Sequence, residues 1–260
     1  MKYALAVEYD GRAFHGWQIQ KDLPTVQAAL EAALGQMAGE AIQVHAAGRT
    51  DAGVHGARQI VHFETTVNRP LTAWVRGINS FLPDAVAVLW AKPVSEVFHA
   101  RFSAFSRHYR YLLLSHPVRP ALWSGRMGWT FYELDFEAMQ AAARHLLGQH
   151  DFTSFRAAEC QAKSPVKTMT QVQLQKEGNL FICDFSADAF LHHMVRNIMG
   201  ALLHVGKGHE SPEWMADLIL ARDRTSAPPT FMPDGLYLAG VSYPPEFALD
   251  SEPVLRHGLI

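Results

Sequence analysis

The sequence has few of the features that mark secreted, membrane or metal-binding proteins. Its 260 residues include two cysteines, Cys160 and Cys183, which form no CxxC pair. This usage is typical of reduced thiols in a cytoplasmic protein, with a disulfide as the alternative. No apolar run approaches the ~20 residues that a bilayer-spanning helix requires, and acids and aromatics interrupt the N-terminal run MKYALAVEYD too early for a signal peptide. The sequence therefore predicts a cytoplasmic protein without a membrane partner.

Charged residues are also scarce, at 18% of the chain, and the formal net charge is −2. Proteins that bind nucleic acid over a broad surface are normally basic. The balance counts against a general nucleic-acid binder but leaves room for a local basic cleft. The hydrophobic fraction of 48% is ordinary for a globular protein, and a chain of this length can form one domain or two.

The first part of the chain alternates between strand and helix patterns. The expected elements are a strand over 3–9, a helix over 25–37, strands over 42–46 and 57–64, a helix over 71–82 and a strand over 85–92. The order β-α-β-β-α-β is that of the split βαβ or ferredoxin-like arrangement. It predicts that residues 1–104 form one ferredoxin-like domain.

The second part repeats this order with additions. Asp135 is the expected N-cap of a helix that Gly148 ends. The expected elements are a strand over 106–115, an added strand near 127–132, a helix over 135–147, a hairpin over 169–184, helices over 192–205 and 212–220, and a strand over 236–243. The sequence thus predicts an α+β protein of two ferredoxin-like halves, with helices packed on antiparallel or mixed sheets. The predicted limits are 1–104, 105–246 and a tail over 247–260.

One loop concentrates chemically useful side chains. Residues 47–56 read AGRTDAGVHG and lie between two predicted strands, with Asp51 flanked by Arg49 and His55. A hairpin needs only about two to five connecting residues, so this connection is long. Long loops on a rigid scaffold often carry catalytic groups. An aspartate in a glycine-rich turn more often bonds nearby backbone N–H groups, and the loop alone favours that interpretation over catalysis.

The run GRTDAGVHG resembles the signature of the TruA family of tRNA pseudouridine synthases, in which the aspartate is the nucleophile. Four further runs are similar to motifs of that family: FHARFSA at 98–104, HYRY at 108–111, FLHHMVRN at 190–197 and GLYL at 235–238. The resemblance extends in order from about Leu5 to Tyr243. One departure is TFMP at 230–233, where the family often has a run of small residues.

The resemblance implies isomerisation of uridine to pseudouridine at positions 38, 39 and 40 of the tRNA anticodon stem-loop. It also implies a homodimer, no cofactor, no required metal and an active-site cleft between the two domains. Asp51 would be the nucleophile. Arg196 would keep the carboxylate ionised and hold it in a bidentate fork. Tyr109 would stack on the uracil and help to remove the C5 proton, although a core position on its strand is the alternative.

The same resemblance assigns further substrate contacts. Arg49 would fill the place of the uridine as it leaves the stack. Arg101 and Arg110 are candidates for phosphate contacts, with structural salt bridges as an equal alternative. His55 and Leu236 are also predicted to line the substrate site.

Two rival hypotheses come from the residues themselves. Fourteen histidines, with His45, His55 and His62 near Asp51, suggest a metal enzyme, but no HExxH or Cys/His zinc spacing occurs. The adjacent His192 and His193 would point roughly 100° apart on a helix and could not share a metal. A catalytically inactive RNA-binding module is the other rival. The expected middle strand lacks the aromatic pattern of RNA-recognition motifs, which favours an enzyme.

Overall fold

The computed structural model describes residues 1–249, which form two compact units. The first comprises Met1–Ser106 and the chain from Tyr237 onward, and the second comprises Arg107–Leu236. Both units combine helices with strands, so the α+β class is confirmed. The limits 1–104, 105–246 and 247–260 stay a prediction about domains. Residues 250–260 of the predicted tail lie outside the described residues.

The elements of the first unit follow the predicted order. They are β1 (Lys2–Tyr9), η1 (Gly11–Ala13), α1 (Val26–Ala38), β2 (His45–Ala46), β3 (His55–Glu64), α2 (Leu71–Phe81), β4 (Val86–Pro93) and, from Tyr237, β10 (Leu236–Ser242). β1 lies between β4 and β3 and is antiparallel to both, and β2 is antiparallel to β3. β10 pairs with β3 in parallel through Tyr237 and Leu238. The sequence boundary near 104 did not anticipate this pairing, because a parallel ladder between distant segments leaves no local pattern.

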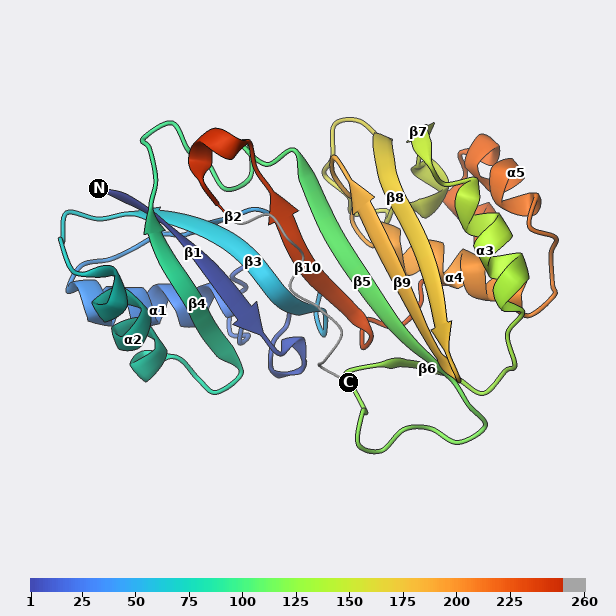
Figure 1. The fold of residues 1–260 in the computed structure, drawn as a ribbon, viewed down its shortest axis with the longest axis horizontal. Helices are drawn as coiled ribbons and strands as arrows, with labels where there is room; N and C mark the ends of the chain where they lie inside the picture. Colours follow the sequence, from blue (N-terminus) through green and yellow to red (C-terminus); the bar gives the residue numbers. More distant parts are fainter. Residues whose placement is uncertain (250–260) are drawn as a thin grey trace. The chain divides into compact units, whose positions relative to one another are not determined.

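The core of the first unit lies between the strands and the helices α1 and α2, which cover one face of β1 and β4 (Figure 1). Leu5, Leu30 and Trp74 are fully buried there. The expected cap of α1 forms, because the Thr25 hydroxyl accepts a hydrogen bond from the backbone N–H of Ala28 at 3.4 Å. Alternation in β1 and helical spacing in α1 therefore bury one face of each element against the other.

The second unit contains one strand that the sequence pattern did not predict. Its elements are β5 (Ser106–Ser115), β6 (Gly128–Thr130), α3 (Phe136–Arg144), β7 (Gly148–Asp151), η2 (Thr153–Phe155), β8 (Val166–Glu177), β9 (Leu180–Ala187), α4 (Met194–Gly206), α5 (Trp214–Ala221) and η3 (Arg224–Ser226). The strands follow the order β5-β9-β8-β7, and β6 is parallel to β5. The four residues of β7 carry no strand pattern and are recruited by antiparallel pairing with β8. The helices α3, α4 and α5 lie together (Figure 1).

The start of α4 corrects one prediction. The helix begins at Met194, because His193 has φ of 60° in the left-handed region. The rings of His192 and His193 therefore lie side by side, with centroids 4.0 Å apart. The prediction that they point about 100° apart was wrong, because it assumed that both residues were helical.

Other sequence expectations concern the cysteines and membrane spans. Cys160 and Cys183 are both free thiols, and burial raises the pKa of Cys183. No helix within residues 1–249 combines the length and the apolar character that a bilayer crossing requires.

Three histidine rings gather on the first unit at the end of β3 that carries Glu64. The ring centroid of His62 lies 4.9 Å from that of His45 and 4.6 Å from that of His99. His62 is 3% exposed, and its Nδ1 accepts a hydrogen bond from the backbone N–H of Ala100 at 3.1 Å. Burial, and then the nearby His99, His45 and Lys2, lower the pKa of His62 to about 4.

We expect this lowered pKa to make folding stability depend on pH between about 6.5 and 4. In the unfolded chain His62 takes up a proton near pH 6.5, whereas in the folded chain it does so near 4. The unfolding free energy therefore keeps the full contribution of the neutral, buried His62 above pH 6.5. It loses this contribution progressively as the pH falls from 6.5 to 4, because the unfolded chain then binds the proton more tightly. Between pH 7 and 4.5 the wild type should lose about 2 kcal/mol more unfolding free energy than His62→Asn, which keeps an acceptor near the Nδ1 position. Urea unfolding at both pH values measures the difference, and equal losses would contradict the prediction.

Candidate active-site residues

The Asp51 loop is held on several sides by hydrogen bonds within the first unit. The hydroxyls of Tyr9 and Thr50 are 2.8 Å apart, and the Thr50 carbonyl accepts from the backbone N–H of Trp17 at 3.0 Å. The Gln59 amide donates to the Gly48 carbonyl at 2.6 Å. The backbone N–H of Val54 bonds the Asp51 carbonyl at 3.1 Å. These bonds fix the backbone that carries the half-buried Asp51.

Two glycines let the segment over 10–17 pack against this loop. A Cβ atom at Gly11 would lie 2.2 Å from the Val54 carbonyl oxygen, and one at Gly16 would lie 2.8 Å from the Thr50 carbonyl oxygen. Gly16 also has φ of +90°, which residues with side chains rarely adopt. The backbone contact around Asp51 is thus close enough to require glycine at both positions.

The residues that support the loop were missed by sequence reasoning. Tyr9, Thr50 and Gln59 are buried polar residues, and burial raises the pKa of Tyr9. Gln59 is fully buried on β3, and a buried amide needs a hydrogen-bond partner, but the strand HGARQIVHFE also carries two histidines and an arginine, so Gln59 did not stand out in the sequence. Tyr9 gave no signal either, since its partner lies 41 residues away in the chain.

His55 lies inside the first unit rather than on its surface. Its ring is 3% exposed and stacks on Tyr237, with centroids 4.6 Å apart and planes 18° apart. Its Nδ1 accepts from the backbone N–H of Gly11 at 3.1 Å and lies 3.4 Å from Oδ1 of Asp10. The pKa of Asp10 is lowered to about 2, chiefly by hydrogen bonding to Arg12. These contacts give His55 a role in holding the loop, and its contact with substrate stays a prediction.

The other candidates of the first unit are exposed arginines. Arg49 precedes Asp51 in the same loop and is exposed. The Arg101 guanidinium lies over the exposed Phe102 ring, 5.4 Å from its centroid. Exposure is compatible with the RNA contacts predicted for both arginines.

In the second unit, Tyr109 and Arg110 are neighbours on β5. Tyr109 is half-buried and meets the ring of Phe190 edge-on, at 4.9 Å between centroids. Tyr111, two residues along the same strand, is fully buried. The core position that was the alternative role for Tyr109 is therefore occupied by Tyr111, whereas Tyr109 is only half-buried. Arg110 forms a bidentate pair with Asp184, through Nε at 2.7 Å and Nη2 at 2.8 Å, which supports the salt-bridge alternative for Arg110.

Arg196 lies in the first turn of α4 and is bonded to the segment over 230–233. Its Nε donates to the Phe231 carbonyl at 2.9 Å, and its own carbonyl accepts from the backbone N–H of Phe231 at 3.2 Å. Leu236 is 4% exposed, and its backbone N–H bonds the Pro233 carbonyl at 2.8 Å. The segment that departs from the family pattern is thus in direct contact with Arg196.

The histidines of the metal hypothesis do not gather around Asp51 in the first unit. His55 and His62 are seven residues apart on the extended strand β3, which corresponds to about 23 Å. His45 pairs with His62 and not with His55. The arrangement of His45, His55 and His62 around Asp51 that this hypothesis requires is therefore not formed.

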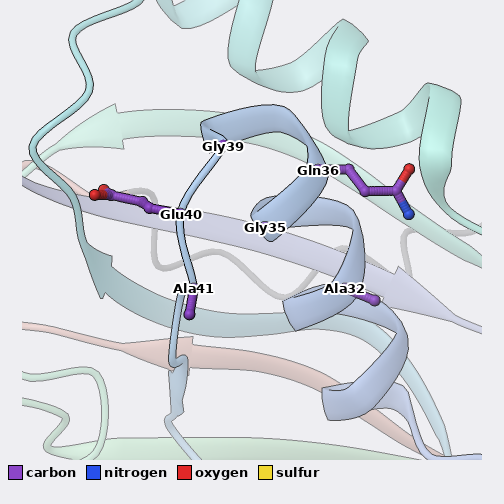
Figure 2. Close-up of a pocket in the computed structure, with 6 residues that line it drawn as sticks. All are labelled: Ala32, Gly35, Gln36, Gly39, Glu40 and Ala41. Atoms are coloured by element: carbon purple, nitrogen blue, oxygen red, sulfur yellow. The ribbon is translucent and has the colours of Figure 1, made fainter.

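A shallow hollow at the end of α1 contains none of the predicted site residues. Figure 2 shows its lining, which consists of Ala32, Gly35, Gln36, Gly39, Glu40 and Ala41. The Glu40 carboxylate accepts hydrogen bonds from the hydroxyl groups of Thr65 and Thr66. The carboxylate in this lining is thus bonded to two threonines, and the hollow lies apart from the Asp51 loop in the sequence.

Comparisons with known proteins agree with the motifs. A family model described as tRNA pseudouridine synthase matches residues 5–103 and 142–244. The chain is 62% identical to tRNA pseudouridine synthase A of Chromobacterium violaceum over 252 residues, which cover 96% of each chain. It is 58% identical to the protein of that name from Dechloromonas aromatica, covering 96% of this chain and 95% of the relative. It is 56% identical to the protein of that name from Nitrosomonas eutropha, covering 98% of this chain and 92% of the relative.

Proposed function

The chain belongs to the tRNA pseudouridine synthase family, and from this we propose that it converts uridine to pseudouridine at positions 38, 39 and 40 of the tRNA anticodon stem-loop. The observation that carries the proposal is the Asp51 loop. Its sequence is the family signature, and hydrogen bonds from Trp17 and Gln59 hold it in place. A loop fixed in this way presents one carboxylate on a rigid scaffold, as covalent catalysis requires.

The reaction suits a carboxylate acting without a redox group. The bond between N1 of uracil and C1′ of ribose breaks, the uracil turns, and C5 is joined to C1′. The C5 proton is lost and N1 regains a proton, so the product is an isomer of the substrate. In this proposal Asp51 attacks either C1′ or C6 and forms a covalent intermediate. The uridine is flipped out of its stack, and Arg49 fills the vacated place.

Residues of the second unit complete the proposed chemistry. The guanidinium of Arg196 pairs with the Asp51 carboxylate, because an opposite charge favours the ionised nucleophile. Tyr109 stacks on the uracil and assists removal of the C5 proton. The partial exposure of Tyr109 is compatible with that contact. Arg101, which belongs to the first unit, contacts RNA phosphate, and we expect such contacts to make tRNA affinity fall with salt.

The same family resemblance supports the remaining parts of the proposal. Each unit is a ferredoxin-like half, and the substrate enters a cleft formed by both. The enzyme acts as a homodimer in the cytoplasm and needs neither a metal nor an organic cofactor. The strand order β4-β1-β3 with β2 on β3 supports the ferredoxin-like assignment of the first half.

The proposed reaction is tested with unmodified tRNA transcripts that carry tritium at C5 of uridine. Formation of pseudouridine replaces the C5–H bond and releases the label to water. The wild type should release it from the anticodon arm in the presence of EDTA, and transcripts with cytidine at positions 38, 39 and 40 should release none.

Three other results would each contradict part of the proposal. Binding of tRNA without release would support the inactive binding module. Release that EDTA abolishes would restore the metal hypothesis. Release from a transcript without uridine at these positions would refute the proposed target sites.

A further inference from the structure

The orientation of Arg196 depends on a segment that has no regular structure. Residues 227–233, here called the strap, follow η3 and run past the first turns of α4 without forming helix or strand. The strap touches Arg196 at Phe231, which both accepts from Nε of Arg196 and donates to its carbonyl. Since Nε lies in the guanidinium plane, the position of the Phe231 carbonyl determines how that plane is oriented.

A triangle of polar side chains holds the strap against α4. The Thr230 hydroxyl donates to Oδ1 of Asn197 at 2.7 Å and accepts from Nη2 of Arg224 at 3.2 Å. The same Nη2 donates to Oδ1 of Asn197 at 3.1 Å. Arg224 also donates through Nη1 to the Ala227 carbonyl at 3.1 Å, and the Asn197 amide donates to the Phe155 carbonyl at 2.8 Å. The triangle thus joins the start of the strap, at Ala227, and its middle, at Thr230, to the fully buried Asn197.

Two further contacts fix the strap on either side of the triangle. A Cβ atom at Gly200 would lie 2.6 Å from the Pro229 carbonyl oxygen, so the strap approaches the helix closely at this point. The Tyr111 hydroxyl donates to the Met232 carbonyl at 2.9 Å. The strap is therefore held at residues 227, 229, 230 and 232, on both sides of Phe231, which bonds Arg196.

From this arrangement we propose that Thr230, Asn197 and Arg224 are positioning residues for Arg196, acting through the strap. The inference rests on the proposed role of Arg196 and deepens it. Asn197 follows Arg196 directly on α4 and is fully buried, so it links the helix that carries the guanidinium to the strap that orients it. Burial also lowers the pKa of Arg224. Arg224 is half-buried and makes three hydrogen bonds to the strap and α4, so it connects these two segments.

The test uses Thr230→Val, which keeps the shape of the side chain and removes its hydroxyl. We expect kcat for pseudouridine formation to fall about tenfold, because small displacements of a catalytic group are costly. The KM for tRNA should stay within about twofold, since the triangle does not contact RNA in this proposal. Thr230→Ser restores the hydroxyl and should restore kcat. Arg224→Lys, a second route to the same loss, should lower kcat in the same way.

The double variant separates positioning from general damage. If Thr230 acts through Arg196, Thr230→Val should change kcat less than about twofold when Arg196→Lys is already present, because coupled residues are not additive. Arg222→Lys is the matched control for Arg224→Lys. Arg222 is 66% exposed and lies outside the triangle, so this variant should behave as the wild type.

Each contrary outcome identifies what has failed. A wild type that forms no pseudouridine would refute the proposed function and, with it, this inference. An Arg196→Lys variant with wild-type kinetics would refute the role of Arg196 that the triangle serves. A low kcat for Arg196→Lys but a normal kcat for Thr230→Val and Arg224→Lys would refute the positioning role alone. Equal losses from Thr230→Val in both backgrounds, or no rescue by Thr230→Ser, would also refute it.

Discussion

Replacing Asp51 by asparagine is expected to abolish pseudouridine formation while leaving tRNA binding nearly unchanged. The amide has the shape of the carboxylate but cannot serve as the nucleophile, so kcat should fall by at least about 10⁴-fold. The loop should keep its conformation, because its bonds with Tyr9, Trp17 and Gln59 do not use the Asp51 side chain. Single-turnover tritium release measures the first quantity, and the dissociation constant for tRNA measures the second.

Two companion variants make this result decisive. Asp84→Asn removes the same charge from an exposed turn residue of the same unit and should keep wild-type activity. Asp51→Ala cannot regain a carboxylate by deamidation and should be as inactive as Asp51→Asn. Turnover by Asp51→Ala within about tenfold of the wild type would refute the nucleophile role.

Replacing Arg196 by lysine is expected to lower kcat by about a hundredfold, although the charge is kept. Loss of one well-placed donor to a charged group typically costs about 10²- to 10³-fold. Lysine has no equivalent of the Nε that donates to the Phe231 carbonyl. Its single ammonium group cannot both bond that carbonyl and face a carboxylate with a planar fork. The affinity for tRNA should change little, and steady-state kinetics with one tRNA transcript measure both effects.

Arg144→Lys is the matched control for this substitution. Arg144 is an exposed residue in the last turn of α3, in the same unit as Arg196. The control should show wild-type kinetics. If Arg196→Lys also shows wild-type kinetics, the carboxylate does not depend on a guanidinium fork, and the proposed pairing is wrong.

The sequence predicted the elements whose signals are local. The N-caps of α1 and α3 form as expected, with the Asp135 carboxylate accepting from the backbone N–H of Ala138 at 2.9 Å. The strand over 106–115 also has the predicted bounds. In these cases the periodicity or the cap lies within the element itself, so one stretch of chain contains the whole signal. The predicted end of α3 was wrong, because the helix ends at Arg144 and Gly148 begins β7.

The sequence could not predict features that depend on distant partners. β7 exists because β8 pairs with it. The left-handed backbone of His193 is set by its surroundings, since nothing in the run HHMVRN requires it. The motifs around Asp51 and Arg196 also contain Thr50 and Asn197, but they did not reveal that Thr50 bonds Tyr9 or that Asn197 bonds Thr230 and Arg224.

The pairing of β10 with β3 affects when the surroundings of the Asp51 loop can fold during synthesis of the chain. A ribosome synthesises the Asp51 loop early, but the ring of Tyr237 that stacks on His55 emerges almost two hundred residues later. Until then the edge of β3 at Gly56 lacks its partner strand. A nascent chain can carry the whole signature loop and still have His55 uncovered. The surroundings of the Asp51 loop are therefore completed only after Tyr237 has been synthesised, and a chain that stops before Tyr237 would lack the ring that stacks on His55.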